Sequence, residues 1–107
     1  MISKELIKGT LKFIVLKLLT GNEKMYGYEI TQKISEMTGD RIKLTFAALY
    51  PVLHKLEAEG LVKTTSENVN NRIRKYYSLT AKGAQEAEKK IVEFQEFMEI
   101  MGGIFND

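Results

Sequence analysis

Apolar residues in the first sixty positions recur three and four residues apart, the spacing that gathers side chains on one face of a helix. This pattern predicts helices over residues 3–20, 26–38 and 45–59. Thr45 stands just before the third apolar stripe, where its hydroxyl can accept a hydrogen bond from a backbone amide of the first turn. The same helix contains Pro51, which removes one backbone hydrogen bond, so we expect an irregular first turn.

Two later segments alternate between apolar and polar residues, which is typical of strands. These are residues 61–67 and 72–79, and the four residues between them include three Asn, a residue type that tolerates the left-handed backbone of a tight turn. The pattern predicts a β-hairpin. Residues 41–44 alternate in the same way, and we expect a short additional strand there.

Residues 81–107 carry a helical pattern of another kind, with apolar residues alternately three and four apart through three heptads. Gly102–Gly103 is expected to interrupt this helix before Ile104. A long apolar stripe is unfavourable in water, and the preceding elements already suffice for a domain, so we predict homodimerisation. The alternative is a helix that folds back on its own domain. The predicted dimer residues are Leu11 and Val15 of the first helix with Ala84, Ala87, Ile91, Phe94, Met98, Met101 and Phe105.

Three helices followed by a β-hairpin is the element order of a winged helix-turn-helix. The predicted fold class is therefore α+β, mainly α. A winged helix-turn-helix domain occupies residues 1–80, and a C-terminal dimerisation helix occupies residues 81–107. In such a domain the third helix presents side chains to the DNA major groove and the hairpin forms the wing.

The composition narrows the classes of function. The chain has 107 residues, 44% of them hydrophobic, which fits one globular domain. It contains no Cys and one His, so we expect neither a disulfide framework nor a metal site, and no cofactor. No apolar run approaches the roughly 20 residues that span a bilayer, and no signal peptide is evident, so we expect a cytoplasmic protein without a membrane partner. No nucleophile–base set or phosphate loop suggests an enzyme.

Positive charge concentrates where the third helix and the hairpin are predicted. Residues 41–82 hold eight Lys or Arg against three Glu, a net +5, whereas residues 83–107 hold two Lys against six acidic residues, a net −4. A polyanion would be steered to the first region and repelled by the second. The alternative is a charge-mixed surface whose asymmetry has no function.

Double-stranded DNA is the partner that this arrangement predicts. In a homodimer each third helix would enter a major groove of an inverted repeat, with half-sites roughly 34 Å apart. Direct pairing of Arg with guanine or Asn with adenine is available only from the wing. Alternatively, Tyr50 packs beneath the wing and His54 is an ordinary surface residue. The predicted DNA-binding residues are Lys43, Thr45, Tyr50, His54, Lys55, Asn70, Asn71, Arg72, Arg74 and Lys75.

Three motifs in this order resemble the PadR family of bacterial and archaeal transcriptional regulators, in particular its short-chain members. They are YGYEI at residues 26–30, LYPVLHKLEAEGLV at residues 49–62 and RKYYSLTAKG at residues 74–83. The resemblance implies a dimer joined by the first and last helices, a recognition helix at residues 45–59 and a wing at residues 66–75. It also implies repression that is relieved by phenolic acids or other small aromatic compounds.

A ligand pocket is the last expectation from the sequence. Some relatives bind flat hydrophobic drugs between their C-terminal helices with the help of a tryptophan; this chain has no Trp, and Phe94 appears at the matching position. Met and Phe adapt to varied apolar ligands, so we predict an inducer pocket across the dimer at Phe94, Phe97, Met98 and Met101. Dense packing without a cavity is the alternative. The rival function is a winged-helix module that binds proteins and ignores DNA.

Overall fold

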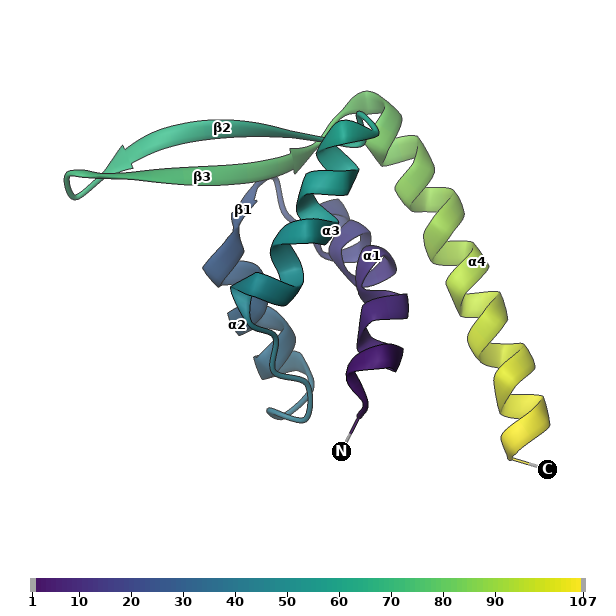
Figure 1. Ribbon diagram of the computed structural model, residues 1–107. Coiled ribbons are helices and arrows are strands. Elements are labelled where there is room, and N and C mark those ends of the chain that lie inside the picture. Colours follow the sequence, from purple (N-terminus) through teal and green to yellow (C-terminus); the bar gives the residue numbers. More distant parts are fainter. Residues whose placement is uncertain (1, 107) are drawn as a thin grey trace.

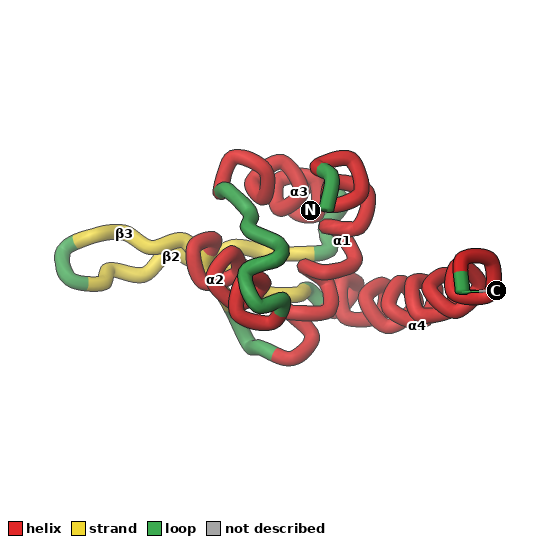
Figure 2. The backbone as a smooth tube through the Cα atoms, turned by 90° about the horizontal axis from the view of Figure 1, so that it is seen from below, coloured by secondary structure: helices red, strands yellow, loops and turns green. Residues whose placement is uncertain are grey.

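The computed structural model describes residues 2–106, which form four helices and three strands. Three helices make a compact helical body, and a β-hairpin and a long C-terminal helix leave this body on opposite sides (Figures 1 and 2). The predicted class, mainly helical with a winged helix-turn-helix, is confirmed. The elements are α1 (Lys4–Gly21), β1 (Met25–Tyr26), α2 (Gly27–Met37), α3 (Phe46–Ala58), β2 (Val62–Val69), β3 (Arg72–Leu79) and α4 (Ala81–Phe105).

The core lies where the apolar stripes of α1, α2 and α3 meet the base of the sheet. Its side chains are almost fully removed from water, and each large one contributes about 1.5–3 kcal/mol by burial. None of the helices described is long and apolar enough to cross a membrane. The largest fully buried side chains are Leu11, Val15 and Leu16 of α1, Ile30 of α2, and Leu49, Leu53 and Leu56 of α3.

The cap of α3 forms as its sequence predicts. The Thr45 hydroxyl accepts a hydrogen bond from the Ala48 amide at 3.1 Å. The Thr45 carbonyl accepts from both Ala48 and Leu49, each at 3.2 Å, so the first turn contains a shared bond. The helix continues through Pro51 to Ala58.

We call β2, β3 and the turn between them the wing. The two strands pair antiparallel with Val69 opposite Arg72, which leaves Asn70 and Asn71 as a two-residue turn. Their φ values are 52° and 64°, the left-handed region that a tight hairpin turn requires and that Asn adopts more readily than most residues. The left-handed backbone of this two-residue turn therefore helps to set the strand register.

The short strand predicted at residues 41–44 does not form. The free edge of β3 is taken instead by β1, where Met25 and Tyr26 pair with Tyr77 and Tyr76. The amide of Ile42 bonds to the Thr38 hydroxyl at 3.1 Å, so this segment is held by a local turn.

The start of α4 is fixed tightly to the base of the wing. Thr80 alone separates β3 from α4, and its hydroxyl accepts from the Gly83 amide at 2.9 Å and donates to the Gly60 carbonyl at 2.6 Å. The Thr80 amide donates to the Leu61 carbonyl at 3.1 Å. A Cβ at Gly83 would overlap that same carbonyl, so only glycine permits this close approach.

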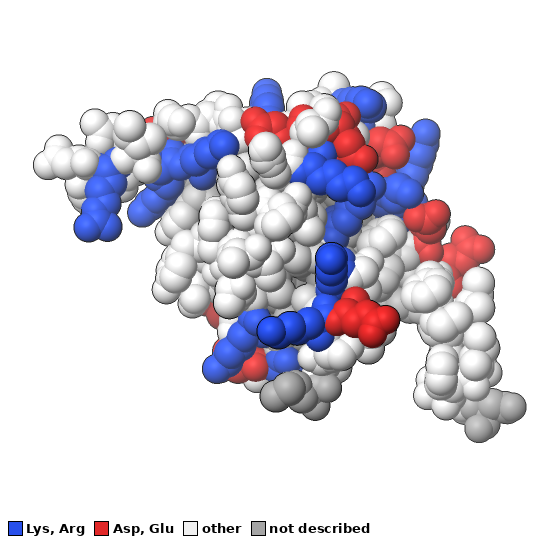
Figure 3. Space-filling view, viewed as in Figure 1, with Lys and Arg blue, Asp and Glu red and all other residues white. Residues whose placement is uncertain are grey.

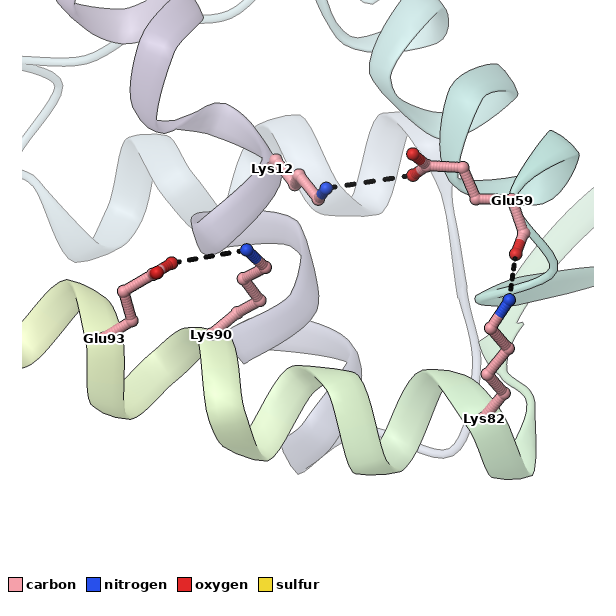
Figure 4. A network of polar contacts seen from close by, with 5 residues as sticks. All are labelled: Lys12, Glu59, Lys82, Lys90 and Glu93. Atoms are coloured by element: carbon pink, nitrogen blue, oxygen red, sulfur yellow. Dashed lines mark hydrogen bonds and ion pairs between the residues drawn. The ribbon is translucent and has the colours of Figure 1, made fainter.

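Polar contacts join α1, α3 and α4 near this junction. Glu59, at the end of α3, lies 3.8 Å from the Lys12 ammonium of α1, and its carbonyl accepts from Lys82 of α4 at 3.1 Å (Figure 4). Lys90 and Glu93 pair at 3.3 Å farther along α4. These exposed contacts add little energy, because surface ion pairs are usually worth less than about 1 kcal/mol.

The first half of α4 packs on α1, as the folding-back alternative proposed. Ala87 is completely buried, and the rings of Phe13 and Phe94 stack with centroids 5.0 Å apart. The predicted interruption at Gly102–Gly103 is wrong, because α4 runs to Phe105 and the Asn106 amide still donates to the Gly102 carbonyl at 2.9 Å.

The second half of α4 extends beyond the helical body. We call its exposed apolar side the distal face, which consists of Phe97, Ile100, Ile104 and Phe105. The exposed fractions of these side chains run from 51% to 79%.

Candidate nucleic-acid interface

The exposed surface of α3 carries three rings in a row. Phe46, Tyr50 and His54 follow one another at intervals of four residues, and successive ring centroids are 5.5 Å apart. All three side chains are exposed, as are Thr45 and Lys55. Tyr50 therefore does not lie buried beneath the wing, and the predicted recognition helix offers an exposed aromatic surface.

The wing supplies the cations. Arg72 and Lys75 are exposed on β3, and Asn70 and Asn71 are exposed at its turn. Figure 3 shows Lys and Arg atoms along the side of the wing that faces the helical body, while acidic groups gather over the junction with α4. An anion that approaches the helical body beside the wing would therefore meet positive charge first.

Arg74 differs from its neighbours because it is held in place. Its guanidinium lies 4.1 Å from the centroid of the Tyr26 ring, and it donates to the Tyr76 hydroxyl at 3.4 Å. The hydrogen bond to Tyr76 raises the pKa of Arg74, and the side chain is half-buried. This guanidinium is thus a fixed positive charge at the base of the wing.

A second cation fixes the wing to β1. Lys24 pairs with Glu67 of β2 and lies 4.6 Å from the centroid of the Tyr76 ring. The hydrogen bond with Glu67 raises the pKa of Lys24. The Tyr26 and Tyr76 rings meet edge to face at 5.6 Å, so alternating cations and rings join β1 to both strands of the wing.

A groove of about 1130 Å³ separates the wing from α2 and α3. It brings together five of the predicted DNA-binding residues: Tyr50, Asn70, Arg72, Arg74 and Lys75. Lys43 lies instead at a smaller hollow beside Asp40. The remaining four predicted residues, Thr45, His54, Lys55 and Asn71, are exposed outside the groove lining.

The groove also contains residues that the sequence analysis missed. Tyr28 and Gln32 enter it from α2, Phe46 from α3 and Ile73 from the wing. Tyr28 and Gln32 could have been found from the sequence, because helical spacing places them on the side of α2 opposite Ile30 and Ile34. Ile73 is on the same face of β3 as the buried Tyr77, but it is 81% exposed because the wing extends past the helical body.

The residues predicted to form the dimer contact differ in how much of their surface is exposed. Leu11, Val15 and Ala87 are at most 1% exposed within the protomer's own core, so they have no surface left for a second chain and the prediction is corrected for these three. Ile91 and Phe94 are half-buried against α1. The other members, Ala84, Met98, Met101 and Phe105, retain accessible surface on α4.

An apolar pocket of about 350 Å³ lies between α1, the end of α2 and the middle of α4. Phe94 and Met98 line it, together with Phe13 and Met37 of the same chain. Phe97 and Met101 do not line it, because the neighbouring walls come from α1 and α2 of the same chain. Lys17 is a cation at this pocket. Among residues 2–106, no three His, Cys, Asp or Glu side chains are grouped as a metal site would require.

Most of the chain is similar in sequence to a family of transcriptional regulators. Residues 15–89 match the model of the transcriptional regulator PadR-like family. An uncharacterized protein of Lysinibacillus sphaericus is 32% identical over 102 residues, which is 94% of this chain and 93% of that protein. The negative transcriptional regulator PadR of Bacillus subtilis is 33% identical over 91 residues, covering 83% of this chain and 49% of that longer protein.

Solved structures show the same similarity. A transcriptional regulator from Clostridium thermocellum superposes with a TM-score of 0.84 and 27% sequence identity, covering 98% of this chain and 99% of that one. The helical body, the wing and α4 therefore occur together in an experimental structure of similar length.

Proposed function

This chain belongs to the transcriptional regulator PadR-like family, a family of DNA-binding regulators and not of enzymes, and from that premise we propose that it is a cytoplasmic homodimeric repressor. The observation that carries the proposal is the groove between α3 and the wing, where exposed rings face three cations. A cationic wing beside an exposed helix suits a duplex, because phosphates and base edges can be contacted together.

In the proposed complex α3 enters the major groove and the wing follows the flanking backbone. Arg72 and Lys75 are exposed and would neutralise phosphates; the Lys75 ammonium also lies 5.6 Å from the centroid of the Tyr77 ring. The fixed guanidinium of Arg74 would set where a phosphate is bound. Lys43 and Lys55, which lie outside the groove, would contact backbone on either side. Their role would be positioning, since phosphate contacts carry no sequence information directly.

The distal face supports the proposal of a dimer. Phe97, Ile100 and Ile104 are all more than half exposed on one helix, and they form an apolar side next to the one that packs on α1. A second copy of α4 would cover this face and place two recognition helices on a twofold axis. The operator would then be an inverted repeat with half-sites roughly 34 Å apart.

The apolar pocket supports release of the repressor by a small aromatic compound. Its volume of about 350 Å³ is at the lower end of ligand sites, and Phe13, Phe94 and Met98 provide adaptable apolar walls. Lys17 would neutralise an acidic group on such a compound. The relative from Bacillus subtilis is named a negative regulator, which favours repression over activation.

A mobility shift tests the proposal directly. Purified protein is titrated against the duplex upstream of its own coding region and against a random duplex pool, at several salt concentrations. Retention of a specific duplex, with affinity that falls steeply as salt rises, is the expected result. Failure to retain any duplex at low salt would refute DNA binding and favour a protein-binding module. Adding aromatic acids to the complex then tests for release.

A further inference from the structure

The exposed side chains of residues 46–51, where α3 begins, are apolar apart from the Tyr50 hydroxyl, and this limits how the helix can read a sequence. We propose that α3 recognises its half-site through the methyl groups of thymines, and not through paired hydrogen bonds to guanine or adenine. This inference rests on the proposed DNA binding and names the feature of the duplex that the same surface selects.

Residues 45–51 of α3 and its cap lack every side chain that pairs with a base edge through two hydrogen bonds. The segment reads TFAALYP, with no Arg, Lys, Asn, Gln, Asp or Glu. Arg and Lys pair with guanine, and Asn and Gln with adenine, through such bonds. Thr45 already uses its hydroxyl oxygen to accept from Ala48, so the Tyr50 hydroxyl is the main polar group that remains.

The apolar side chains of this segment point outward. Phe46, Ala47, Tyr50 and Pro51 are exposed, outside the side of the helix that buries Leu49 and Leu53. Phe46 and Tyr50 are 49% and 41% exposed, which is unfavourable for large rings in water unless a partner covers them. In the major groove the thymine C5-methyl is the apolar group available to cover them.

The rings are fixed before any DNA binds. Phe46 packs so closely on Gly27 of α2 that a Cβ there would overlap the ring. Tyr50 lies against Phe46 with centroids 5.5 Å apart, and His54 meets Tyr50 at the same separation. Little side-chain freedom is therefore lost on binding, and the positions of the recognised methyl groups are set by the helix.

Phosphate binding is supplied elsewhere, which leaves α3 free for this task. Arg72, Arg74 and Lys75 project from the wing and supply the charge-dependent part of the affinity. We therefore expect the wing to bind any duplex and α3 to select thymine-containing sequences.

The experiment replaces thymidine by deoxyuridine, one position at a time, in a duplex retained in the mobility shift. Uracil keeps the base pair and every hydrogen-bonding group of thymine and lacks only the methyl. At two or more positions of each half-site we expect affinity to fall about fourfold, the loss that corresponds to one buried carbon group. Positions outside the half-sites serve as controls and should show no change.

Two variants of Tyr50 connect the effect to this helix. Tyr50→Ala should bind the thymine and uracil duplexes equally at the position it covers, whereas Tyr50→Phe should still prefer thymine about fourfold, because the ring and not the hydroxyl covers the methyl. Both substitutions are at an exposed position, and circular dichroism verifies that each variant is folded.

Each outcome has a definite meaning. A protein that binds the thymine duplex and every uracil duplex equally would overturn the inference and leave the proposed function intact. A Tyr50→Phe variant that loses the preference as fully as Tyr50→Ala would also overturn it, since the hydroxyl would then be the reading group. A protein that binds no duplex would overturn both proposals.

Discussion

The wing and α4 both leave the helical body, but they differ in what they expose and in how they are held. The wing carries Arg72, Arg74 and Lys75 on one strand, and it is joined to β1 by cation–ring contacts. The second half of α4 carries three Glu and no Lys or Arg after Lys90, and its distal face is apolar. Each projection is therefore suited to a different partner.

The difference between the wing and α4 shows how one small chain can keep DNA binding and self-association on separate surfaces. Charge on the wing attracts a polyanion from a distance and can be screened by salt. The apolar distal face acts only in contact, and its contribution grows with the area removed from water. Salt should therefore weaken DNA binding while leaving the proposed dimer largely unaffected. The following predictions test this separation.

The largest effect is expected at the junction that both projections share. Gly83→Ala would place a Cβ on the backbone carbonyl of Leu61, which cannot rotate away, so we expect a loss of stability of about 3 kcal/mol. Thermal unfolding measures it. Gly9→Ala is the matched control, because nothing lies within 4 Å of its added Cβ and the helix should gain about 0.5–1 kcal/mol. Equal melting of the two variants would contradict the close contact.

The next effect concerns the distal face alone. Ile104→Glu places a carboxylate in the proposed dimer contact, and burying it unpaired should weaken self-association by at least about 100-fold. Sedimentation gives the mass at several concentrations. Gln85→Glu, at an exposed position of α4 near the body, is the control and should still dimerise. Monomers in the wild type would refute the dimer itself.

A smaller effect is expected on the wing. Arg72→Ala should weaken binding to all duplexes similarly and lower the salt slope of log affinity by about one unit per protomer, or about two for the proposed dimer. Arg74→Ala should lower the slope by the same amount and also lower the unfolding temperature, since its guanidinium packs on Tyr26. An unchanged slope in either variant would remove that arginine from the contacts. Neither variant should alter the dimer.

The smallest effect is expected where the wing meets β1. Lys24→Ala and Glu67→Ala each break one exposed ion pair, so we expect small decreases in unfolding temperature that disappear at high salt. The double variant should lose little more than either single variant. A large decrease that persists in salt would show that packing of Lys24 on the Tyr76 ring dominates.

Local patterns in the sequence were sufficient for much of the fold. The caps at Thr45 and Thr80 need only a hydroxyl before a helix, and both form as hydrogen bonds in the structure. The Asn70–Asn71 turn follows from two residues that tolerate positive φ. Such features depend on a few neighbouring residues, and a sequence displays them directly.

Features that depend on distant contacts were not predictable in this way. β1 has two residues, too few for an alternating pattern, and it exists because β3 offers a free edge. The requirement for glycine at position 83 could not be predicted, because the Leu61 carbonyl that imposes it is 22 positions away in the chain. Ala87 belongs to a heptad pattern, but periodicity cannot tell whether α1 of the same chain or a second chain covers it.

The charged residues of the candidate site were predicted from the sequence, but some of the apolar residues that line it were not. Lys and Arg in a hairpin are evident from the sequence, whereas nothing in the sequence shows that Tyr28 of α2 and Phe46 of α3 lie in one groove beside the wing. The fixed position of Arg74 was not predicted, because nothing in the sequence places Tyr26 beneath its guanidinium.

Thr80 has a mechanical consequence. Thr80 is the single residue between β3 and α4, and its amide and hydroxyl are both hydrogen-bonded to the backbone of Gly60 and Leu61. We therefore expect β3 and α4 to move together as one rigid body. In the proposed dimer, a slight change in the crossing angle of the paired α4 helices would swing the two wing tips through a much larger arc. The gap between the tips, and with it the operator spacing they can span, would then be set far from the DNA.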